Sequence, residues 1–421
     1  MVIDELSPGE GPVPATGTRR RAGSTLDAID GVAPDVVFSP DTTADVVSIV
    51  EECRSSGRAI IATGGATLLE LGNVPRRFEV RLDLLRLSQT IEHSPKDMVV
   101  TVAASVSLAR LNEQLADAGQ RVALTATEPQ RATIGGLAAS DFSGPLAYGF
   151  GSPRDQILGM TVVDGCGRRL RLGGRVVKNV AGYDLPRLFI GSCGTLGVIT
   201  ELTLRTHPCP EKSRSARIDY FDWDSLDAAR AALFASNLPL SAIDTEVESC
   251  AGSHRWSLEI LIEGTASEVS YQEDRVEQLC GGRLTEVVRE PSESRAIPEQ
   301  APVVVRTSGR PAYGIRLAAD LVREADTHGM DCRINAESAG ARLRWAVDCR
   351  RTEDCTPLIA LAQGLATRYG ATAVVERMPS REKRAVDIWG PVPVGFDIMK
   401  RLKRRFDPDE IFAPGRFVGG L

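Results

Sequence analysis

Three groups of small residues could expose main-chain amides to a ligand. Successive N–H groups in a glycine-rich turn form a concavity that binds a phosphate without the help of a lysine. Any one group is explained equally well as a tight turn, but three of them between residues 64 and 197 favour a ligand. The groups are "GGAT" at 64–67, "TIGGLAASDFSGP" with Gly135, Gly136 and Gly144, and "GSCGTLG" with Gly191, Gly194 and Gly197. An extended ligand that passes several loops is therefore expected.

The common nucleotide-binding motifs are missing. The sequence contains no GxxxxGK[ST] and no GxGxxG between a strand and a helix with an acidic residue about 20 positions later. "GFGSPRD" at 149–155 matches GxG only superficially. These absences argue against a P-loop hydrolase and against a classical NAD-binding Rossmann enzyme.

The first glycine group follows a predicted strand–helix–strand unit. The apolar run 36–38 predicts a strand, and Asp41 or Thr42 can cap the helix that follows. Gly57 ends this helix and residues 59–62 return as a strand, so a parallel pair is expected. The buried face of the helix is predicted to hold Val46, Val47, Val50 and Cys53.

The pattern changes near residues 207–212, where two prolines interrupt a strand. Before it, the segment "GMTVVDGCGRRLRLGG" predicts a β-hairpin around "DGCG". After it, helical patterns are longer and glycine pairs are few. We expect an α+β protein with a mobile N-terminal tail (1–33), a ligand-binding domain (34–210) and a smaller α+β cap (211–421).

A helix is predicted near the C-terminus in "FDIMKRLKRRF". Its buried side is expected to carry Ile398, Leu402 and Phe406. Five basic residues should cover the solvated side, with a nucleic-acid or membrane patch as the alternative. They are Lys400, Arg401, Lys403, Arg404 and Arg405.

Composition limits the function classes. The formal net charge of −6 over 421 residues argues against polyanion binding as the main role. Nine cysteines occur without any CxxC pair, so neither an iron–sulfur cluster nor another metal site is predicted, and reduced thiols in a cytoplasmic protein are the simpler interpretation. No stretch is apolar enough to span a bilayer.

Several segments resemble the vanillyl-alcohol-oxidase type of FAD-binding proteins, also called the PCMH type. They are "SPDTTADVVSIVEECRSSGRAIIATGGATL", "TIGGLAAS", "KNVAGYDLPRLFIGSCGTLGVITELTLR" and the terminal "FDPDEIFAPGRF". The resemblance is strong over about residues 34–210, and within the family it points to the FAD-binding subunits of bacterial glycolate oxidases. It implies a PCMH-type FAD-binding domain of two subdomains, followed by the cap, with the terminal motif returning to the FAD domain.

The resemblance also implies the residues that hold FAD without a covalent link. The pyrophosphate would lie at the first glycine group, the flavin and ribityl chain at the second, and the adenosine half at the third. The cofactor-binding residues implied are Thr63, Gly64, Gly65, Ala66, Thr67, Leu68, Ile134, Gly135, Gly136, Ser140, Gly144, Gly197, Val198 and Ile199.

The sequence offers no clear catalytic residue. Oxidation of a 2-hydroxy acid needs an arginine to hold the carboxylate and a base, usually histidine, to take the hydroxyl proton. All four histidines stand alone near turns and none is predicted to be catalytic: His93, His207, His254 and His328. Arg342 and Arg344 are more simply explained by alternation on a strand whose Leu343 and Trp345 face the core.

The motif match leaves three weak catalytic candidates, which are Lys178, Tyr183 and Arg416. For the first two, a buried tyrosine hydroxyl and a lysine that stabilise the loop are the plain alternative.

The resemblance implies a flavin subunit that oxidises glycolate to glyoxylate beside a homologous catalytic flavin subunit and an iron–sulfur subunit. The complex would be cytoplasmic or would contact the inner membrane through its partners, without nucleic acid and without an integral membrane segment. Two alternatives stay open: a self-sufficient FAD-dependent 2-hydroxy acid dehydrogenase, and a non-catalytic assembly subunit that has lost flavin.

Overall fold

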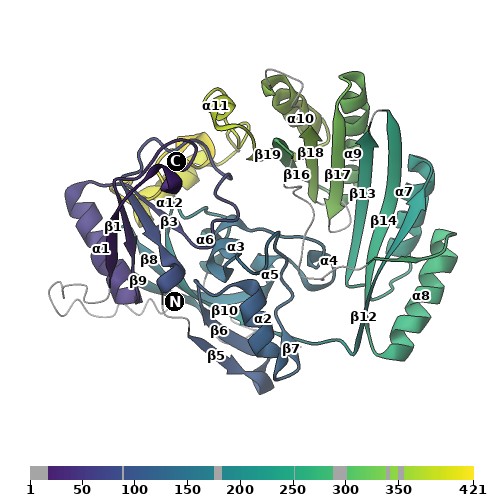
Figure 1. Ribbon diagram of the computed structural model, residues 1–421, viewed down its shortest axis with the longest axis horizontal. Coiled ribbons are helices and arrows are strands. Elements are labelled where there is room, and N and C mark those ends of the chain that lie inside the picture. The colour runs from purple at the N-terminus through teal and green to yellow at the C-terminus, as the bar shows by residue number, and fades with distance from the viewer. Residues whose placement is uncertain are drawn as a thin grey trace.

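The chain forms an α+β structure in which an N-terminal domain faces a cap (Figure 1). The computed structural model describes residues 18–87, 90–174, 183–250, 252–287, 301–337, 342–348 and 355–421. Within these ranges, no helix is long and apolar enough to cross a membrane.

The first sheet of the N-terminal domain has four strands in the order β1-β2-β4-β3, and β4 runs parallel to both β2 and β3. The expected parallel pair is therefore separated by one strand. The helix between them begins and ends as predicted, because the Thr42 side chain accepts a hydrogen bond from the Asp45 amide and Gly57 adopts a left-handed φ of 66°. The elements are β1 (Arg19–Ala22), β2 (Val36–Ser39), α1 (Thr43–Ser56), β3 (Ile60–Thr63) and β4 (Val80–Asp83).

The expectation of a mobile tail over residues 1–33 is wrong for the described part of this segment, which begins at residue 18. Strand β1 pairs antiparallel with β2. Asp27 is buried and accepts two hydrogen bonds from Arg21, at 2.6 and 2.7 Å. Ladder hydrogen bonds and this ion pair order a segment whose composition resembles that of a disordered tail.

The second sheet of the N-terminal domain is antiparallel, in the order β5-β6-β10-β8-β9. The predicted hairpin is confirmed as β8 paired with β9. Short helices connect the strands, and a two-stranded ladder of β7 and β11 closes one end. The elements are β5 (Ile91–Ser94), β6 (Val99–Ala103), α2 (Leu108–Ala116), β7 (Gln120–Arg121), α3 (Ile134–Ser140), α4 (Ala147–Phe150), α5 (Pro153–Gln156), β8 (Ile157–Asp164), β9 (Arg169–Gly173), α6 (Pro186–Phe189), β10 (Gly197–Arg205) and β11 (His207–Pro208).

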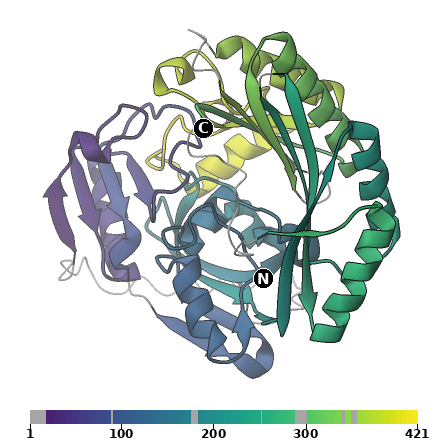
Figure 2. The same ribbon diagram turned by 45° about the vertical axis from the view of Figure 1, so that its right-hand side comes forward.

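The cap is one eight-stranded antiparallel sheet in the order β15-β12-β14-β13-β17-β18-β16-β19. Four long helices cover its outer face, and its other face is turned toward the N-terminal domain (Figures 1 and 2). The chain enters the cap at β12, directly after β11. The elements are β12 (Lys212–Tyr220), α7 (Trp223–Ala235), β13 (Ala242–Cys250), β14 (Ser253–Gly264), α8 (Ala266–Cys280), β15 (Thr285–Glu286), β16 (Val303–Ser308), α9 (Pro311–Thr327), β17 (Asp331–Glu337), β18 (Arg342–Asp348), α10 (Thr356–Arg368) and β19 (Thr372–Arg377).

After the cap, α11 (Ser380–Lys383) and α12 (Phe396–Phe406) lead the chain back to the N-terminal domain (Figure 1). The Ile60 amide donates to the Ile411 carbonyl at 2.7 Å, and the Ala413 amide donates to the Ile60 carbonyl at 2.8 Å. The buried face predicted for α12 is wrong at Ile398, which is 54% exposed, whereas Lys403 is buried. The Lys403 ammonium is ordered by Asp407 and two carbonyls, so a cation replaces an apolar side chain inside.

One cysteine departs from the expectation of reduced thiols. Cys355 is disulfide-bonded, and its partner lies outside the described residues.

Candidate functional site: a cavity lined by three glycine loops

All three glycine groups border one cavity in the N-terminal domain. It lies between the loop after β3, helix α3 and the start of β10, and encloses about 920 Å³ of space that is partly open to solvent. The lining residues are Ile61, Ala62, Thr63, Gly64, Gly65, Ala66, Thr67, Leu68, Leu69, Leu71, Leu84, Ala104, Thr133, Gly135, Gly136, Ala139, Ser140, Cys193, Gly194, Gly197, Val198, Ile199 and Arg416.

The loop after β3 presents unused hydrogen-bond donors to this cavity. Within the described part of the chain, the amides of residues 64–67 donate no hydrogen bond to protein. Ala66 adopts a left-handed φ of 60°, which turns successive N–H groups toward a common point. A Cβ on Gly65 would lie 1.7 Å from the Arg131 carbonyl oxygen, so only glycine fits there. The loop is therefore built to receive an anion.

Helix α3 lines the cavity with small residues, and its first amides already donate hydrogen bonds within the protein. The Gly135 amide donates to the Ala104 carbonyl at 3.0 Å, and the Gly136 amide donates to the Thr133 hydroxyl at 3.2 Å. A Cβ on Gly135 would come within 2.7 Å of the Ala104 Cβ, so this glycine permits close packing. The Ser140 hydroxyl donates back to the Gly136 carbonyl at 2.8 Å. This wall suits a flat ring better than it suits a phosphate.

The third wall includes two residues that were not among the predicted cofactor-binding residues, although Gly194 belongs to the third glycine group. Cys193 and Gly194 line the cavity and have left-handed φ values of 52° and 70°. The Cys193 amide donates to the Ala139 carbonyl at 2.8 Å, which docks this loop on α3. Burial raises the pKa of the Cys193 thiol to about 11. The available signal for Cys193 was its place between the two glycines of "GSCG".

Most of the residues predicted to bind the cofactor meet at the cavity, and their contact with a cofactor stays a prediction. Ile134 and Gly144 are exceptions, because both are buried and neither lines it. Tyr183 is 88% exposed, so the alternative of a buried tyrosine hydroxyl is wrong. Lys178 lies outside the described residues. The predicted residues that line the cavity are Thr63, Gly64, Gly65, Ala66, Thr67, Leu68, Gly135, Gly136, Ser140, Gly197, Val198 and Ile199.

Arg416 lines the cavity, but its guanidinium is bound by other groups of the protein. Its guanidinium donates to the carbonyls of Leu69 and Leu71 at 2.7 and 2.6 Å and lies 3.4 Å from the Asp30 carboxylate. Asp30 also binds the Lys383 ammonium at 2.8 Å, and that ammonium donates to the Glu70 carbonyl. Burial lowers the pKa values of Lys383 and Arg416, and Asp30 partly offsets this. Asp30 and its two cations therefore hold the backbone just after the anion loop.

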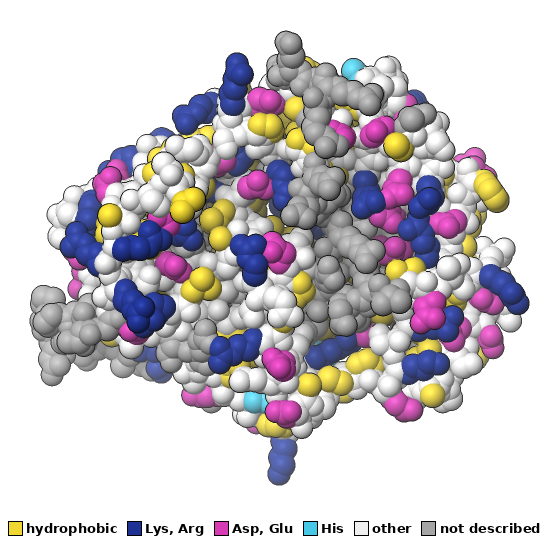
Figure 3. Space-filling model, viewed as in Figure 1, with side chains coloured by type: hydrophobic (Ala, Val, Ile, Leu, Met, Phe, Trp, Pro, Cys, Tyr) yellow, Lys and Arg dark blue, Asp and Glu magenta, His cyan; other side chains and the backbone are white. Residues whose placement is uncertain are grey.

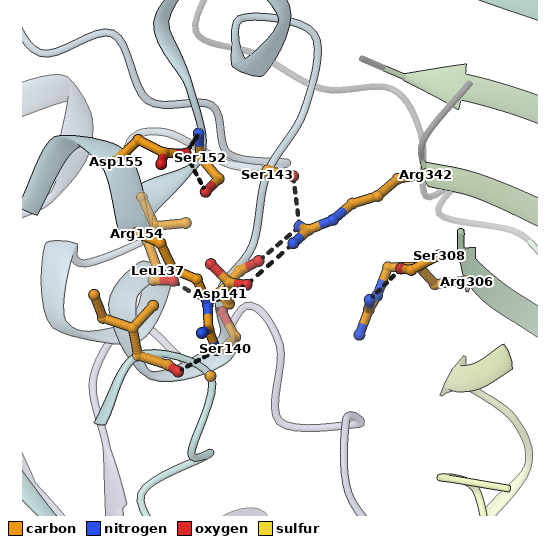
Figure 4. A network of polar contacts seen from close by, with 12 residues as sticks. Leu137, Ser140, Asp141, Ser143, Ser152, Arg154, Asp155, Arg306, Ser308 and Arg342 are labelled. Carbon is orange, nitrogen blue, oxygen red and sulfur yellow. Dashed lines mark hydrogen bonds and ion pairs between the residues drawn. The ribbon is translucent and has the colours of Figure 1, made fainter. Parts of the chain in front are cut away.

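The cap places arginines opposite α3. Arg344 is fully buried between Glu337 and Glu376, at 2.8 and 2.7 Å. Burial opposes its charge, but these two carboxylates outweigh burial and the pKa of Arg344 lies above its ordinary value. Arg342 reaches the N-terminal domain, where it binds the Asp141 carboxylate at 3.0 Å and donates to the Ser143 hydroxyl (Figure 4). These contacts support the structural interpretation of Arg342 and Arg344 rather than a catalytic one.

Arg306, on β16, was missed by the sequence analysis. Its Nε donates to Glu376 at 2.7 Å and its Nη1 to the Ser308 hydroxyl at 3.0 Å, which fixes the side chain on the cap side of the network (Figure 4). Among the described residues, its Nη2 has no acceptor. Arg306 does not line the cavity, but it lies near Cys193 in the cavity wall: burial raises the pKa of that thiol, and the charges of Arg416 and Arg306 partly offset the rise. A lone arginine in the apolar run "VVVRTS" was the available signal.

All four histidines lie within the described residues, and none of them lines the cavity. His93 bonds Gln120, His254 bonds Asp326, and His328 bonds the Glu324 carbonyl. His207 packs against Phe150, and burial lowers its pKa. All four therefore have structural partners.

Comparisons with known proteins agree with this geometry. Residues 34–173 match the family described as FAD binding domain. The chain is 37% identical to the mitochondrial D-lactate dehydrogenase [cytochrome] of Arabidopsis thaliana over 43% of this chain, and it spans only 31% of that protein. It is 28% identical to the glycolate oxidase subunit GlcE of Escherichia coli, covering 79% of this chain and 85% of that subunit. It is also 25% identical to an uncharacterised FAD-linked oxidoreductase of Mycobacterium tuberculosis over about nine-tenths of both chains (92% and 91%).

Solved structures show the same fold at low identity. p-Cresol methylhydroxylase superposes with a TM-score of 0.73 at 18% identity, covering 91% of this chain and 88% of that one. Alkyldihydroxyacetonephosphate synthase superposes with a TM-score of 0.66 at 17% identity, covering 91% and 76%. The fold is that of PCMH-type flavoproteins, and FAD is the cofactor that the domain binds. The unpaired amides of residues 64–67 and the small-residue wall of α3 fit such a ligand.

Proposed function

We propose that this chain, an FAD-binding oxidoreductase by its domain and its relatives, is the FAD-binding subunit of a multi-subunit glycolate (2-hydroxy acid) oxidase. It would work beside a homologous catalytic flavin subunit and an iron–sulfur subunit. The similarity to a glycolate oxidase subunit extends over 85% of that subunit, which supports this choice over the dehydrogenases that the chain matches only in part.

The cofactor would be held mainly by the backbone. The unpaired amides of residues 64–67 would donate to its pyrophosphate, and Gly135, Gly136 and Ser140 would lie against its ring system. The start of β10 would contact the adenosine half. When bound, FAD supplies a two-electron acceptor for the carbon that carries the substrate hydroxyl.

The observation that carries the substrate assignment is Arg306. A guanidinium donates charge-assisted hydrogen bonds to a carboxylate, and Nη2 of Arg306 is free for this role while Glu376 and Ser308 fix its position. Oxidation of glycolate to glyoxylate breaks one C–H and one O–H bond, so Arg306 would orient the acid and a base would take the hydroxyl proton.

The base is the part that this chain lacks among its described cavity residues. Without histidine at the cavity, the hydroxyl proton has no efficient acceptor near neutral pH. We therefore assign the main turnover to the partner flavin subunit, and electron transfer or a slower second site to this chain.

Anaerobic reduction of the flavin tests the proposal. The chain is purified alone and together with its partner subunits, and the flavin absorbance is followed after glycolate or D-lactate is added. We expect slow or no bleaching of the lone chain and rapid bleaching in the complex. In the slow bleaching of the lone chain, the variant Arg306→Met should raise the glycolate concentration for half-maximal bleaching at least about tenfold, because a charge-assisted hydrogen bond is lost. The exposed control Arg323→Met should leave it unchanged.

The same experiment separates the two alternatives. Rapid bleaching and steady turnover by the lone chain would support a self-sufficient 2-hydroxy acid dehydrogenase. A colourless chain that neither retains nor rebinds FAD, yet still joins the complex, would support an assembly subunit that has lost flavin.

A further inference from the structure

We propose that the surface formed by residues 391–398 and the exposed side of α12 binds an anionic lipid surface. We call it the 391–405 surface. Val394 is fully exposed, and Val392 and Ile398 are each about half exposed (52% and 54%). Isolated apolar residues are common on protein surfaces, but these three lie within seven residues of one another and next to a basic helix.

The charge of this surface is opposite to that of the whole chain. Lys400, Arg401, Arg404 and Arg405 are exposed on α12, in a protein with a formal net charge of −6. Lys400 lies 3.7 Å from Asp397 and over the Phe396 ring. In the described chain, the three arginines have no carboxylate partner. Elsewhere, as Figure 3 shows for one face, Lys and Arg side chains are interspersed with Asp and Glu.

The basic side of α12 faces solvent, because contacts on the opposite side of the helix fix its orientation. The buried Lys403 ammonium donates to Asp407 at 2.7 Å and to the carbonyls of Thr195 and Phe412 at 2.8 and 2.9 Å. Lys403 thus ties the helix to the loop before β10. The helix presents its basic side permanently, beside the Pro-containing loop 391–395.

The composition favours lipid over an acidic protein. Protein interfaces are enriched in aromatic residues at their centre, where charged residues are depleted. Here the exposed apolar residues are Val392, Val394 and Ile398, with four cations beside them. Aliphatic side chains can enter the headgroup region while cations pair with lipid phosphates, as amphipathic surface helices do.

Vesicle co-sedimentation tests the inference without any activity measurement. The FAD-loaded chain is mixed with vesicles of phosphatidylcholine alone or of phosphatidylcholine with phosphatidylglycerol. We expect binding to the anionic vesicles only, and release by salt. The triple variant Arg401→Gln/Arg404→Gln/Arg405→Gln should weaken the partition coefficient roughly a hundred-fold, from about fivefold per cation. Val394→Ser should weaken it about tenfold.

A matched control separates this surface from net charge. The variant Arg110→Gln/Arg171→Gln/Arg316→Gln removes the same charge from exposed positions elsewhere and should bind as the parent does. Equal loss in both triple variants, equal binding to neutral and anionic vesicles, or no vesicle binding at all would each overturn the inference. Retained flavin absorbance in every variant shows that the fold is intact.

Discussion

Replacing Asp30 by asparagine should destabilise the protein and weaken FAD binding together. The Asp30 carboxylate lies 2.8 Å from the Lys383 ammonium and 3.4 Å from the Arg416 guanidinium, and the three side chains are 5%, 0% and 4% exposed. Removing one partner of a buried ion pair costs about 3–5 kcal/mol, because the remaining charge is uncompensated. Lys383 and Arg416 keep their backbone carbonyl acceptors, so we expect a loss of about 3 kcal/mol.

Denaturant unfolding measures the stability loss, and fluorescence titration of the apoprotein with FAD measures the affinity. The affinity should fall because the two cations hold the carbonyls of residues 69–71, next to the anion loop. The control Asp409→Asn removes an exposed ion pair with Arg54 and should cost less than about 1 kcal/mol. Adding Lys383→Met to Asp30→Asn should recover part of the stability. If Asp30→Asn costs no more than the control, the reasoning is refuted.

Three further predictions concern single positions. Gly65→Ala should abolish tight FAD binding in a titration, because its Cβ would lie 1.7 Å from a backbone carbonyl oxygen, whereas Gly364→Ala in α10 meets no atom within 4 Å and should bind normally. Alkylation of Cys193 by iodoacetamide should keep accelerating up to about pH 11, the pKa of the buried thiol, and FAD should slow it; a plateau near pH 9 would contradict this. The hydrogen bond from Arg21 holds the pKa of Asp27 below its ordinary value of 3.8, so its stabilisation is complete well above pH 3.8 and is lost as the pH falls through the folded-state pKa. Asp27→Asn should therefore cost more unfolding free energy at pH 7 than at pH 2, and an equal cost at both would refute the assignment.

Local signals in the sequence predicted the elements that local contacts build. The cap at Thr42, the left-handed Gly57 and the hairpin of β8 and β9 each depend on residues within a few positions. The glycine groups were recognisable for the same reason, since the backbone conformation of a loop depends on its own residues.

Contacts between distant residues left no such signal. Asp30 contacts Lys383 and Arg416, which lie more than 350 residues further along the chain, so no periodic pattern predicts the cluster. The amphipathic pattern of α12 predicted a buried Ile398, but the structure buries Lys403 with its own acceptors instead. Arg306 acquires its role only when the cap sheet is turned toward α3.

Hydrogen–deuterium exchange of the FAD-free and FAD-bound chain tests the central claim most directly. The account predicts that FAD protects the amides of residues 64–67 more than any others, because these cavity amides have no protein acceptor in the described chain, while the paired amides of Gly135 and Gly136 change less. Stoichiometric FAD binding without added protection at residues 64–67 would contradict it.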